Sequence, residues 1–337
     1  MAEQTEGIKF TPESLTQTFK TYRKDLIVQP MFAMGELLQH CSIATGIRYR
    51  EIWSEMTGKF QLGNYKKDKK GKGGVDIKAR VFETFFGNCI EPIDPNKIYQ
   101  SIWGSNVTKG EGLKNVPIVL QVCAYMMKQL GENLFLNAFT AKHNGEKFDE
   151  TADFFNGFRT IIDNDIAGTN EIKQVLIAED LKNLKYGTED ITADNAVDII
   201  EDFYWNGTSE KLKKNPALQY FMSTEHYHNY CKDYRQSFGA LPYNQKFTKT
   251  TLDGATNVEL VPLANVPKDF MLITPKSNIY LLFNQKGDDE KFLVERSLEN
   301  HYDVDFLANM FFGTQFESVS SEVLAVWEKK PAAGAGA

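Results

Sequence analysis

The segment His301–Glu317 alternates between apolar and polar residues over an unusual length. From Tyr302 to Phe316, every second position carries an aromatic, aliphatic or small residue, whereas the intervening positions are mainly polar, except Leu307 and Phe311. A period of two predicts a β-strand with one buried face and one wetter face. Ordinary strands contain about five or six residues, so this one would be roughly three times as long. Such a long strand is more typical of a structural protein that spans distance and forms surfaces than of an enzyme.

The composition is that of a globular protein without membrane-spanning segments. A chain of 337 residues, 42% hydrophobic and 25% charged, is long enough for two or three cores. We find no cationic start followed by an apolar run, and no apolar stretch of the roughly 20 residues that cross a membrane. The four cysteines lie far apart, which favours buried, reduced thiols in a cytosolic protein. The net charge of −7 argues against a surface that binds nucleic acid all over.

A basic, glycine-rich run, Lys66–Gly74, lies between two extended stretches, Trp53–Leu62 and Val75–Glu91. The simplest interpretation is a long β-hairpin whose tip is the basic run, with a possible change of alternation near Glu83. Lysine and glycine at a tip are explained by turn geometry and solvation. Binding of nucleic acid or of a neighbouring acidic surface is a minor alternative for the same lysines.

Helical spacing predicts further elements along the chain. The N-terminal sixty residues favour helices or arms with little sheet of their own. Residues 115–139 form the strongest helical pattern, and such a helix would be about 36 Å long. Beyond residue 192 the pattern becomes α/β, and the final residues 331–337 are of low complexity and predict disorder. We expect helices over residues 31–44, 193–204 and 223–239, and strands over 218–222, 258–266, 270–274, 279–283, 292–295 and 322–328.

The candidate chemical sites are weak. His226 and His228 with Cys231 suggest a metal cluster, but helical residues two apart point in nearly opposite directions, and two ligands do not make a zinc site. The run from Asp163 to Asp165 begins like a calcium loop, yet the later ligand positions carry unsuitable residues, so a loop with capping aspartates is the better interpretation. No motif of hydrolases, zinc enzymes or dinucleotide-binding proteins is present. We therefore expect no catalytic, cofactor-binding or metal site.

The order of these elements resembles the major capsid proteins of tailed bacteriophages, which share the Hong Kong 97-like capsid fold, an α+β fold. An N-terminal arm, a long hairpin with a basic tip, a long helix, an α/β part and a closing long strand all match. The local amino-acid sequence also resembles that of such proteins in three segments: Phe221–Tyr234, Leu260–Asn284 and Tyr302–Glu317.

The resemblance implies a division of the chain. It assigns residues 1–50 to an N-terminal arm, 51–93 to an extended loop formed by the long hairpin, 94–166 and 300–330 to a peripheral domain with its spine helix at 115–139, 167–299 to an axial domain, and 331–337 to a disordered tail.

The resemblance also implies a function. Such a chain self-assembles through hexamers and pentamers into an icosahedral shell that packages double-stranded DNA without sequence-specific binding. It would be found in the virion, after assembly in the cytoplasm of the bacterial host. Separate scaffolding and portal proteins are possible partners. Because the arm begins close to the start of the chain, we expect either a separate scaffold or a chain whose scaffolding segment is already trimmed. Some relatives cross-link a lysine to an asparagine between subunits, but none of the lysines of the basic run can be aligned with that lysine, so no cross-link is inferred.

The extended loop would supply the contacts between subunits. A projecting hairpin cannot bury its own apolar residues, so Phe82, Phe85 and Phe86 would need the surface of an adjacent subunit. The lysines of the tip would pair with acidic residues of that neighbour. These lysines are Lys66, Lys67, Lys69, Lys70 and Lys72.

Three alternatives remain open at this stage. The same fold could form an encapsulin-like nanocompartment shell that encloses cargo enzyme. The chain could instead be a soluble cytosolic enzyme with an unrecognised site, at the helix of His226, His228 and Cys231 or in the run that contains Asp163 and Asp165. It could also be a nucleic-acid-binding module that uses the lysines of the tip, in which case binding would depend steeply on salt.

Overall fold

The computed structural model describes residues 34–58, 64, 65, 67, 75–94, 118–168, 177–238, 250–283, 292–298 and 303–330. The helices are α2 (Gly35–His40), α5 (Ile118–Asn137), α6 (Phe158–Ala167), α7 (Ala196–Gly207), α8 (Glu210–Lys213) and α9 (Thr224–Phe238), with short 3-10 turns η1 (Thr151–Asp153), η2 (Glu179–Leu181) and η3 (Lys276–Asn278). The strands are β1 (Ser42–Thr45), β2 (Arg50–Gly58), β3 (Val75–Glu83), β4 (Phe85–Ile93), β5 (Leu184–Gly187), β6 (Leu218–Ser223), β7 (Thr251–Leu252), β8 (Ala255–Leu263), β9 (Phe270–Thr274), β10 (Ile279–Phe283), β11 (Phe292–Arg296), β12 (Val304–Phe316) and β13 (Ala325–Lys329).

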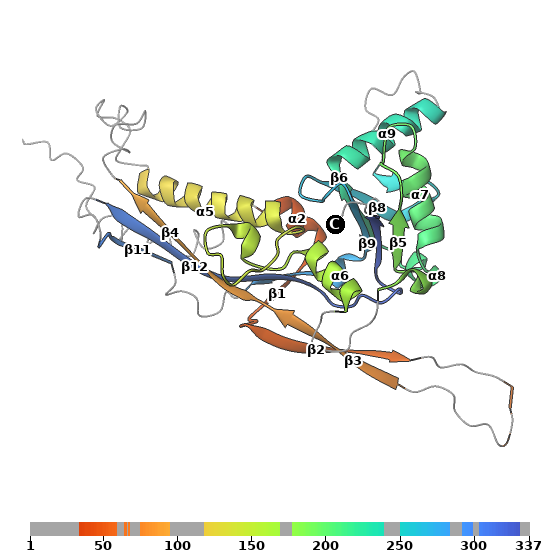
Figure 1. Cartoon of the computed structure of the whole chain (residues 1–337), viewed down its shortest axis with the longest axis horizontal. Coiled ribbons are helices and arrows are strands. Elements are labelled where there is room, and N and C mark those ends of the chain that lie inside the picture. Colours follow the sequence, from red (N-terminus) through yellow and green to blue (C-terminus); the bar gives the residue numbers. More distant parts are fainter. Residues whose placement is uncertain are drawn as a thin grey trace, which may run out of the picture.

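The strand predicted over residues 301–317 is present as β12, which has 13 residues and lies at the centre of a five-stranded sheet. Along one edge β12 pairs with β4 from Val304 to Phe312. Along the other edge it pairs first with β11 and then with β10, and β1 extends the sheet beyond β10. Figure 1 shows α5 lying along this sheet. We call this unit the β12 sheet.

The expected alternation of β12 holds only in its first half. Asp305, Leu307 and Asn309 are partly exposed, as a wetter face should be. From Phe311 onward both faces are buried, including Gly313 and Gln315. The reason is that the base of the hairpin covers the second face at this end of the strand.

A second sheet has six strands in the order β5-β13-β9-β6-β8-β7. One face packs on α7 and α9 through residues such as Tyr220, Met271 and Trp327. The other face carries Phe221 and Leu272, which belong to the same hydrophobic core as the β12 residue Phe312. We call this unit the β13 sheet. Because one core is shared, the two sheets form a continuous body, from which the β2–β3 hairpin projects (Figure 1).

The long hairpin is present, but its second strand was predicted too long. Strand β3 pairs with β2 from residue 75 to Glu83, and after Thr84 the chain leaves the hairpin to form β4 beside β12. Thr84 fixes this crossing, since its N–H donates to Tyr49 O at 2.8 Å and its hydroxyl donates to Ile47 O at 3.2 Å. At the same point a side chain on Gly313 would lie 2.4 Å from Glu83 O. The change of alternation noted near Glu83 therefore marks a strand that moves from one sheet to another.

Several expected boundaries need correction. Part of the range 1–50, expected to be an arm, belongs to the body: Met34 and Leu37 lie in the core, and β1 joins the β12 sheet. Strands β10 and β11 fall in the range expected for the axial domain, yet they pair with β12. Strand β13 falls in the range expected for the peripheral domain, yet it pairs with β5 and β9. The tail at 331–337 and the start of the arm lie outside the described residues.

Local signals located two helices well. The helix expected over residues 115–139 is α5, described from Ile118 to Asn137. The helix expected after Ser223 is α9, and the Ser223 hydroxyl accepts a hydrogen bond from the N–H of His226 at 3.1 Å, as an N-cap does. The helix expected over 31–44 stops at His40, because the chain turns into β1.

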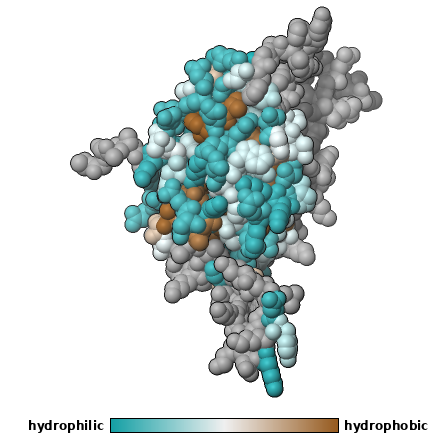
Figure 2. Space-filling view, turned by 90° about the vertical axis from the view of Figure 1, so that its right-hand side faces the viewer, coloured by the Kyte–Doolittle hydropathy of each residue, from teal (hydrophilic) through white to brown (hydrophobic). Residues whose placement is uncertain are grey.

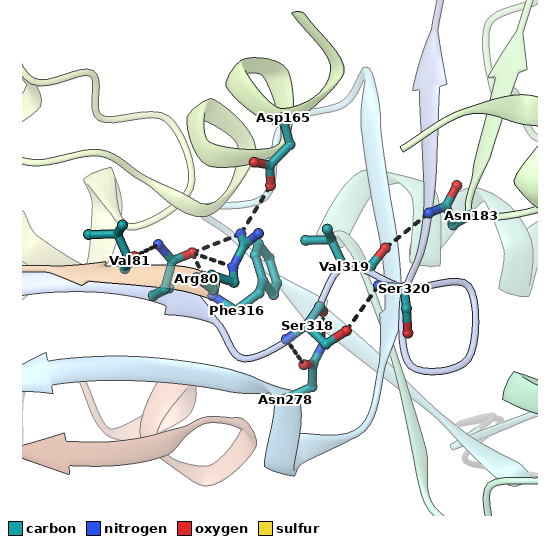
Figure 3. Close-up of polar contacts among 10 residues, drawn as sticks. Arg80, Val81, Asp165, Asn183, Asn278, Phe316, Ser318, Val319 and Ser320 are labelled. Carbon is teal, nitrogen blue, oxygen red and sulfur yellow. Dashed lines mark hydrogen bonds and ion pairs between the residues drawn. The ribbon is translucent and has the colours of Figure 1, made fainter. Parts of the chain in front are cut away.

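A buried ion pair fastens the hairpin to the body (Figure 3). Arg80 of β3 donates to the Asp165 carboxylate of α6 at 3.0 Å, and the two side chains are 6% and 1% exposed. Arg80 also donates twice to the Gln315 amide oxygen of β12, at 2.9 and 3.2 Å. Gln315 in turn donates to Val81 O at 2.6 Å. Hairpin, helix and long strand thus meet at a single guanidinium group.

A second polar group holds the chain where it passes from β12 to β13 (Figure 3). The Asn278 side chain donates to Ser318 O and accepts from the N–H of Ser318, at 2.9 and 2.8 Å. At the next residue, Val319 O accepts a hydrogen bond from the Asn183 side chain at 2.9 Å. Since these amides satisfy backbone groups that no strand partner reaches, they set where the long strand ends.

We predict that Arg80→Met and Asp165→Asn each destabilise the chain by about 3–5 kcal/mol, since each breaks a buried ion pair by removing one of its members. The double variant should cost less than the sum of the two single variants, because both single changes remove the same ion pair and the double variant loses it only once. Urea unfolding of the four proteins measures this cycle.

The matched control is Arg50→Ala, which removes the exposed cross-strand pair with Glu83 and should cost less than about 1 kcal/mol. Additive effects of the Arg80 and Asp165 changes would contradict a direct ion pair.

We also predict that Gly313→Ala destabilises the fold by roughly 1–3 kcal/mol or more, because the added methyl group meets the backbone oxygen of Glu83. Gly35→Ala is the control, as a methyl group there meets nothing within 4 Å. Equal urea midpoints for the two variants would show that the crossing can move aside.

Candidate functional site

The β2–β3 hairpin has two faces of different character, which follow from its register. Facing pairs alternate sides, so Trp53 opposite Arg80 lies on one side, and Ile52 opposite Val81 lies on the other. The first side turns toward the body at its base. The second side is the candidate functional surface, and we call it the outer hairpin face.

The inner side of the hairpin is packed within the chain. Trp53 stacks on Phe82 with ring centroids 4.0 Å apart, and both rings meet Tyr280 of β10 edge-on. Phe82 is fully buried in a small core with Ile47 and Leu282. The base of the hairpin is therefore held by apolar contacts as well as by Arg80.

The outer hairpin face is apolar and exposed. Ile52, Met56 and Ile77 are 62%, 74% and 68% exposed, and Met56 stands directly opposite Ile77. The cross-strand ion pair between Arg50 and Glu83, at 3.3 Å, marks the end of this apolar face nearest the body. Three large apolar side chains on one side of a two-stranded ribbon have no core to enter, so they offer a surface to a partner.

The structure corrects the role expected for the three phenylalanines. Phe82 and Phe85 do not need another subunit to bury them: Phe82 packs on Trp53, and Phe85 lies in β4, packs on the main core and contacts His143. Phe86 is 46% exposed and contacts Phe311, so it remains available at the surface of the β12 sheet. Sequence reasoning missed Ile52, Met56 and Ile77 as contact residues, although Ile52 and Met56 stand an even number of residues apart and therefore lie on one side of their strand.

Of the five lysines expected to contact a neighbour, the structure describes only Lys67, which is exposed. Lys66, Lys69, Lys70 and Lys72 lie outside the described residues. Their role in pairing with a neighbour stays a prediction.

The candidate chemical groups do not converge. On α9, His226 is buried and His228 is exposed, so the two rings diverge as the helical spacing predicted. Burial lowers the pKa of His226. Asp163 and Asp165 lie in α6 and not in a loop, and Asp165 is committed to Arg80. Within the described ranges, no group of three or more His, Cys, Asp and Glu side chains could hold a metal ion, and no helix is long and apolar enough to cross a membrane.

The end of the molecule formed by α7, α8 and β5 is polar by comparison. Figure 2 shows this end covered mainly by hydrophilic and neutral residues, with small and separate hydrophobic patches. Ion pairs cross it, among them Lys329–Asp190 at 2.5 Å and Lys213–Glu210 at 2.9 Å. The outer hairpin face is thus the more apolar of these two exposed surfaces.

Solved phage structures share this arrangement. A chain of the satellite phage P4 procapsid, determined with its size determination (Sid) protein, is 15% identical, with a TM-score of 0.52 over 89% of this chain and 97% of the other. A chain of the cyanophage A-1(L) capsid asymmetric unit is 13% identical, with a TM-score of 0.56 over 89% and 92%. A chain of the capsid of an empty GTA particle is 9% identical, with a TM-score of 0.54 over 98% and 95%.

No protein-family model and no curated protein sequence matches the chain. The likeness therefore rests on the path of the backbone, which extends over nearly the whole of both chains in each comparison. The chain has the α+β fold of phage major capsid proteins.

Proposed function

We propose that this chain is a structural subunit, without enzymatic activity, that self-assembles through hexamers and pentamers into an icosahedral shell around double-stranded DNA. The fold supports this proposal, and the outer hairpin face carries it, because Ile52, Met56 and Ile77 are 62%, 74% and 68% exposed in the single chain. In an assembled shell, each hairpin has an adjacent copy of the chain that can cover these three side chains.

The hairpin would act as the extended loop that lies over an adjacent subunit. Two-stranded ribbons are marginal in water, and a neighbour that covers the outer hairpin face would stabilise the ribbon and join two subunits at once. Lysines of the tip, including Lys67, would pair with acidic groups of the neighbour and orient it. Each contact can be weak, because a closed shell repeats it many times.

The other units would take the remaining roles. The β12 sheet with α5 would be the peripheral domain, and α5 its spine helix. The β13 sheet with α7, α8 and α9 would be the axial domain, whose tips meet around the symmetry axes.

The assembly and its contents can be tested together. The chain is expressed alone and together with the genes that neighbour its own, and the particles are analysed by size-exclusion chromatography and negative-stain electron microscopy. Closed shells that protect double-stranded DNA from nuclease support the full proposal. Shells that enclose only protein would indicate a nanocompartment, and a small oligomer under every condition would contradict a shell subunit.

We predict that the triple change Ile52→Ser, Met56→Ser and Ile77→Ser prevents assembly while leaving the fold of the chain intact. These side chains are exposed, so their loss should change the free energy of unfolding by less than about 1 kcal/mol. The removal of their apolar area should weaken every contact between copies. Electron microscopy counts the particles, and circular dichroism and urea unfolding report the fold.

The matched control changes three residues of the opposite hairpin side, Glu51, Glu55 and Lys78, to serine. This variant should assemble. If the outer-face variant forms particles as well as the control does, the outer hairpin face does not join subunits.

A further inference from the structure

A second exposed apolar surface lies on the β12 sheet, on the side of β12 opposite to the one that carries the core residue Phe312. Phe86 and Ile90 of β4 stand opposite Phe311 and Leu307 of β12. The Tyr49 ring, at the base of the hairpin, meets the Phe311 ring edge-on with centroids 5.1 Å apart, and Phe86 meets the same ring at 4.8 Å. Tyr49 and Ile90 are 63% and 57% exposed. We call Tyr49, Phe86, Ile90, Leu307 and Phe311 the Tyr49 patch.

The backbone of Tyr49 is held in a conformation that residues with side chains rarely adopt. Its φ is 62°, in the left-handed region. The N–H of Arg50 donates to Arg48 O at 2.9 Å, which closes a strained three-residue turn around Tyr49. Glycine adopts such a turn without strain, so the turn alone does not require a tyrosine. Strain that is kept at an exposed position points to a use for the side chain there.

The outer hairpin face has a hollow between two raised pairs of side chains. The raised pairs are Ile52 with Val81 and Met56 with Ile77. Between them Ser54 stands opposite Ala79, and both of these side chains are small. We call this pair the Ser54–Ala79 notch. Because the side chains of facing sheets interdigitate, such a notch accepts a large ring from another sheet.

The outer hairpin face and the Tyr49 patch have matching lengths. Ile52 and Met56 are four residues apart on β2, as Phe86 and Ile90 are on β4, so each pair spans about 13 Å along its strand. A two-stranded ribbon laid along the β4–β12 pair would therefore bring the apolar side chains of both surfaces into contact together.

Charges of opposite sign follow the apolar residues at one end of each surface. Beyond Met56 the hairpin leads into the basic run, of which Lys67 is described and exposed. Beyond Ile90, Glu91 is exposed, and Asp305 lies on the side of β12 that carries the patch. A hairpin whose tip points toward Glu91 and Asp305 would thus bring unlike charges together, which orients the contact.

The two surfaces are placed to join different copies of the chain. Figure 1 shows the β2–β3 hairpin and the far end of β4 extending from opposite sides of the body. At its base the hairpin turns its other side to β12, where the Gln315 side chain donates to Val81 O. The outer hairpin face of one chain therefore points away from the Tyr49 patch of the same chain.

We propose that the Tyr49 patch receives the outer hairpin face of an adjacent copy, with an aromatic ring of the patch in the Ser54–Ala79 notch and the hairpin tip toward Glu91 and Asp305. The inference rests on the proposed function, because it needs the hairpin to bind another copy. It adds which surface of that copy is bound, and in which direction. Two different surfaces that bind each other make a head-to-tail contact, and such contacts close into rings when the rotation between copies allows it.

The double change Tyr49→Gly with Ile90→Ser tests the patch. Glycine fits the backbone of residue 49 and residue 90 is exposed, so the chain should keep its fold, which circular dichroism and urea unfolding check. Where the wild type assembles, the yield of particles should fall about tenfold or more, since large aromatic side chains commonly dominate the binding energy of an interface. The matched control, Tyr125→Ala with Leu136→Ala, changes side chains of α5 that are 63% and 55% exposed and should assemble like the wild type.

Filling the notch separates a fitted contact from general stickiness. Ala79→Ile adds apolar area to the outer hairpin face, so an unspecific apolar contact would become stronger. In the proposed contact the added side chain occupies the place of the ring, and assembly should fall about tenfold or more. Assembly as good as that of the wild type would overturn the proposed fit.

Mixing two variants tests the head-to-tail contact without a need for shells. The patch variant keeps its hairpin, and the variant with serine at Ile52, Met56 and Ile77 keeps its patch, so one intact contact remains for each unlike pair. We expect each variant to be monomeric alone and the mixture to form heterodimers in sedimentation velocity at high protein concentration. If wild-type shells form but the mixture stays monomeric, the inference is overturned while the proposed function stands. If the wild type forms neither shells nor smaller oligomers, the proposed function fails and the inference fails with it.

Charge reversal tests the direction of the hairpin. Glu91→Lys with Asp305→Lys should weaken the heterodimer by roughly five- to tenfold at low salt, and by less at high salt, as expected for exposed ion pairs. An unchanged affinity at low salt would overturn the proposed direction.

Discussion

The backbone of β12 must find hydrogen-bond partners along both edges for 13 residues, and the rest of the fold is arranged to supply them. No other strand in the described structure is that long, so the partners come in pieces: β4 on one edge, and β11 followed by β10 on the other. The pairing of β4 with β12 reaches only to Phe312, which stands opposite Phe85 at the start of β4. The residues that precede Phe85 belong to the hairpin, because Thr84 separates β4 from β3. The base of the hairpin thus lies beside the part of β12, after Phe312, that β4 does not pair with.

The buried Arg80 group then determines the direction in which the hairpin leaves. A guanidinium with fixed fork geometry bonds one carboxylate of α6 and one amide of β12, so few orientations of β3 satisfy both. A buried ion pair of this kind contributes less to stability than to specificity, because desolvation offsets much of the attraction. For a subunit that must meet copies of itself, a fixed hairpin direction lowers the entropy that each contact costs.

Local patterns predicted those parts of the fold that depend on neighbouring residues in the chain. The alternation of β12, the cap at Ser223 and the divergence of His226 and His228 all express short-range geometry. Local patterns did not predict that β10 pairs with β12 or that β13 pairs with β9. Pairing partners of this kind depend on how the whole core packs. The same holds for Arg80 and Asp165, which are 85 residues apart and follow no motif.

The candidate surface was predicted in place but not in its residues. The hairpin was expected to present apolar side chains to an adjacent subunit, and phenylalanines are the most conspicuous apolar residues in that part of the sequence. The structure buries Phe82 under Trp53 and leaves Ile52 and Ile77 outside, because the side that a strand residue faces is set by register and not by size. Counting parity from both strands toward the tip would have separated the two sides.

A single-particle reconstruction of assembled particles, at a resolution that shows side chains, tests the central claim most directly. We expect Ile52, Met56 and Ile77 of each hairpin to be covered by an adjacent copy of the chain. Particles in which these three side chains face solvent, or particles that never form with any partner gene, would contradict it.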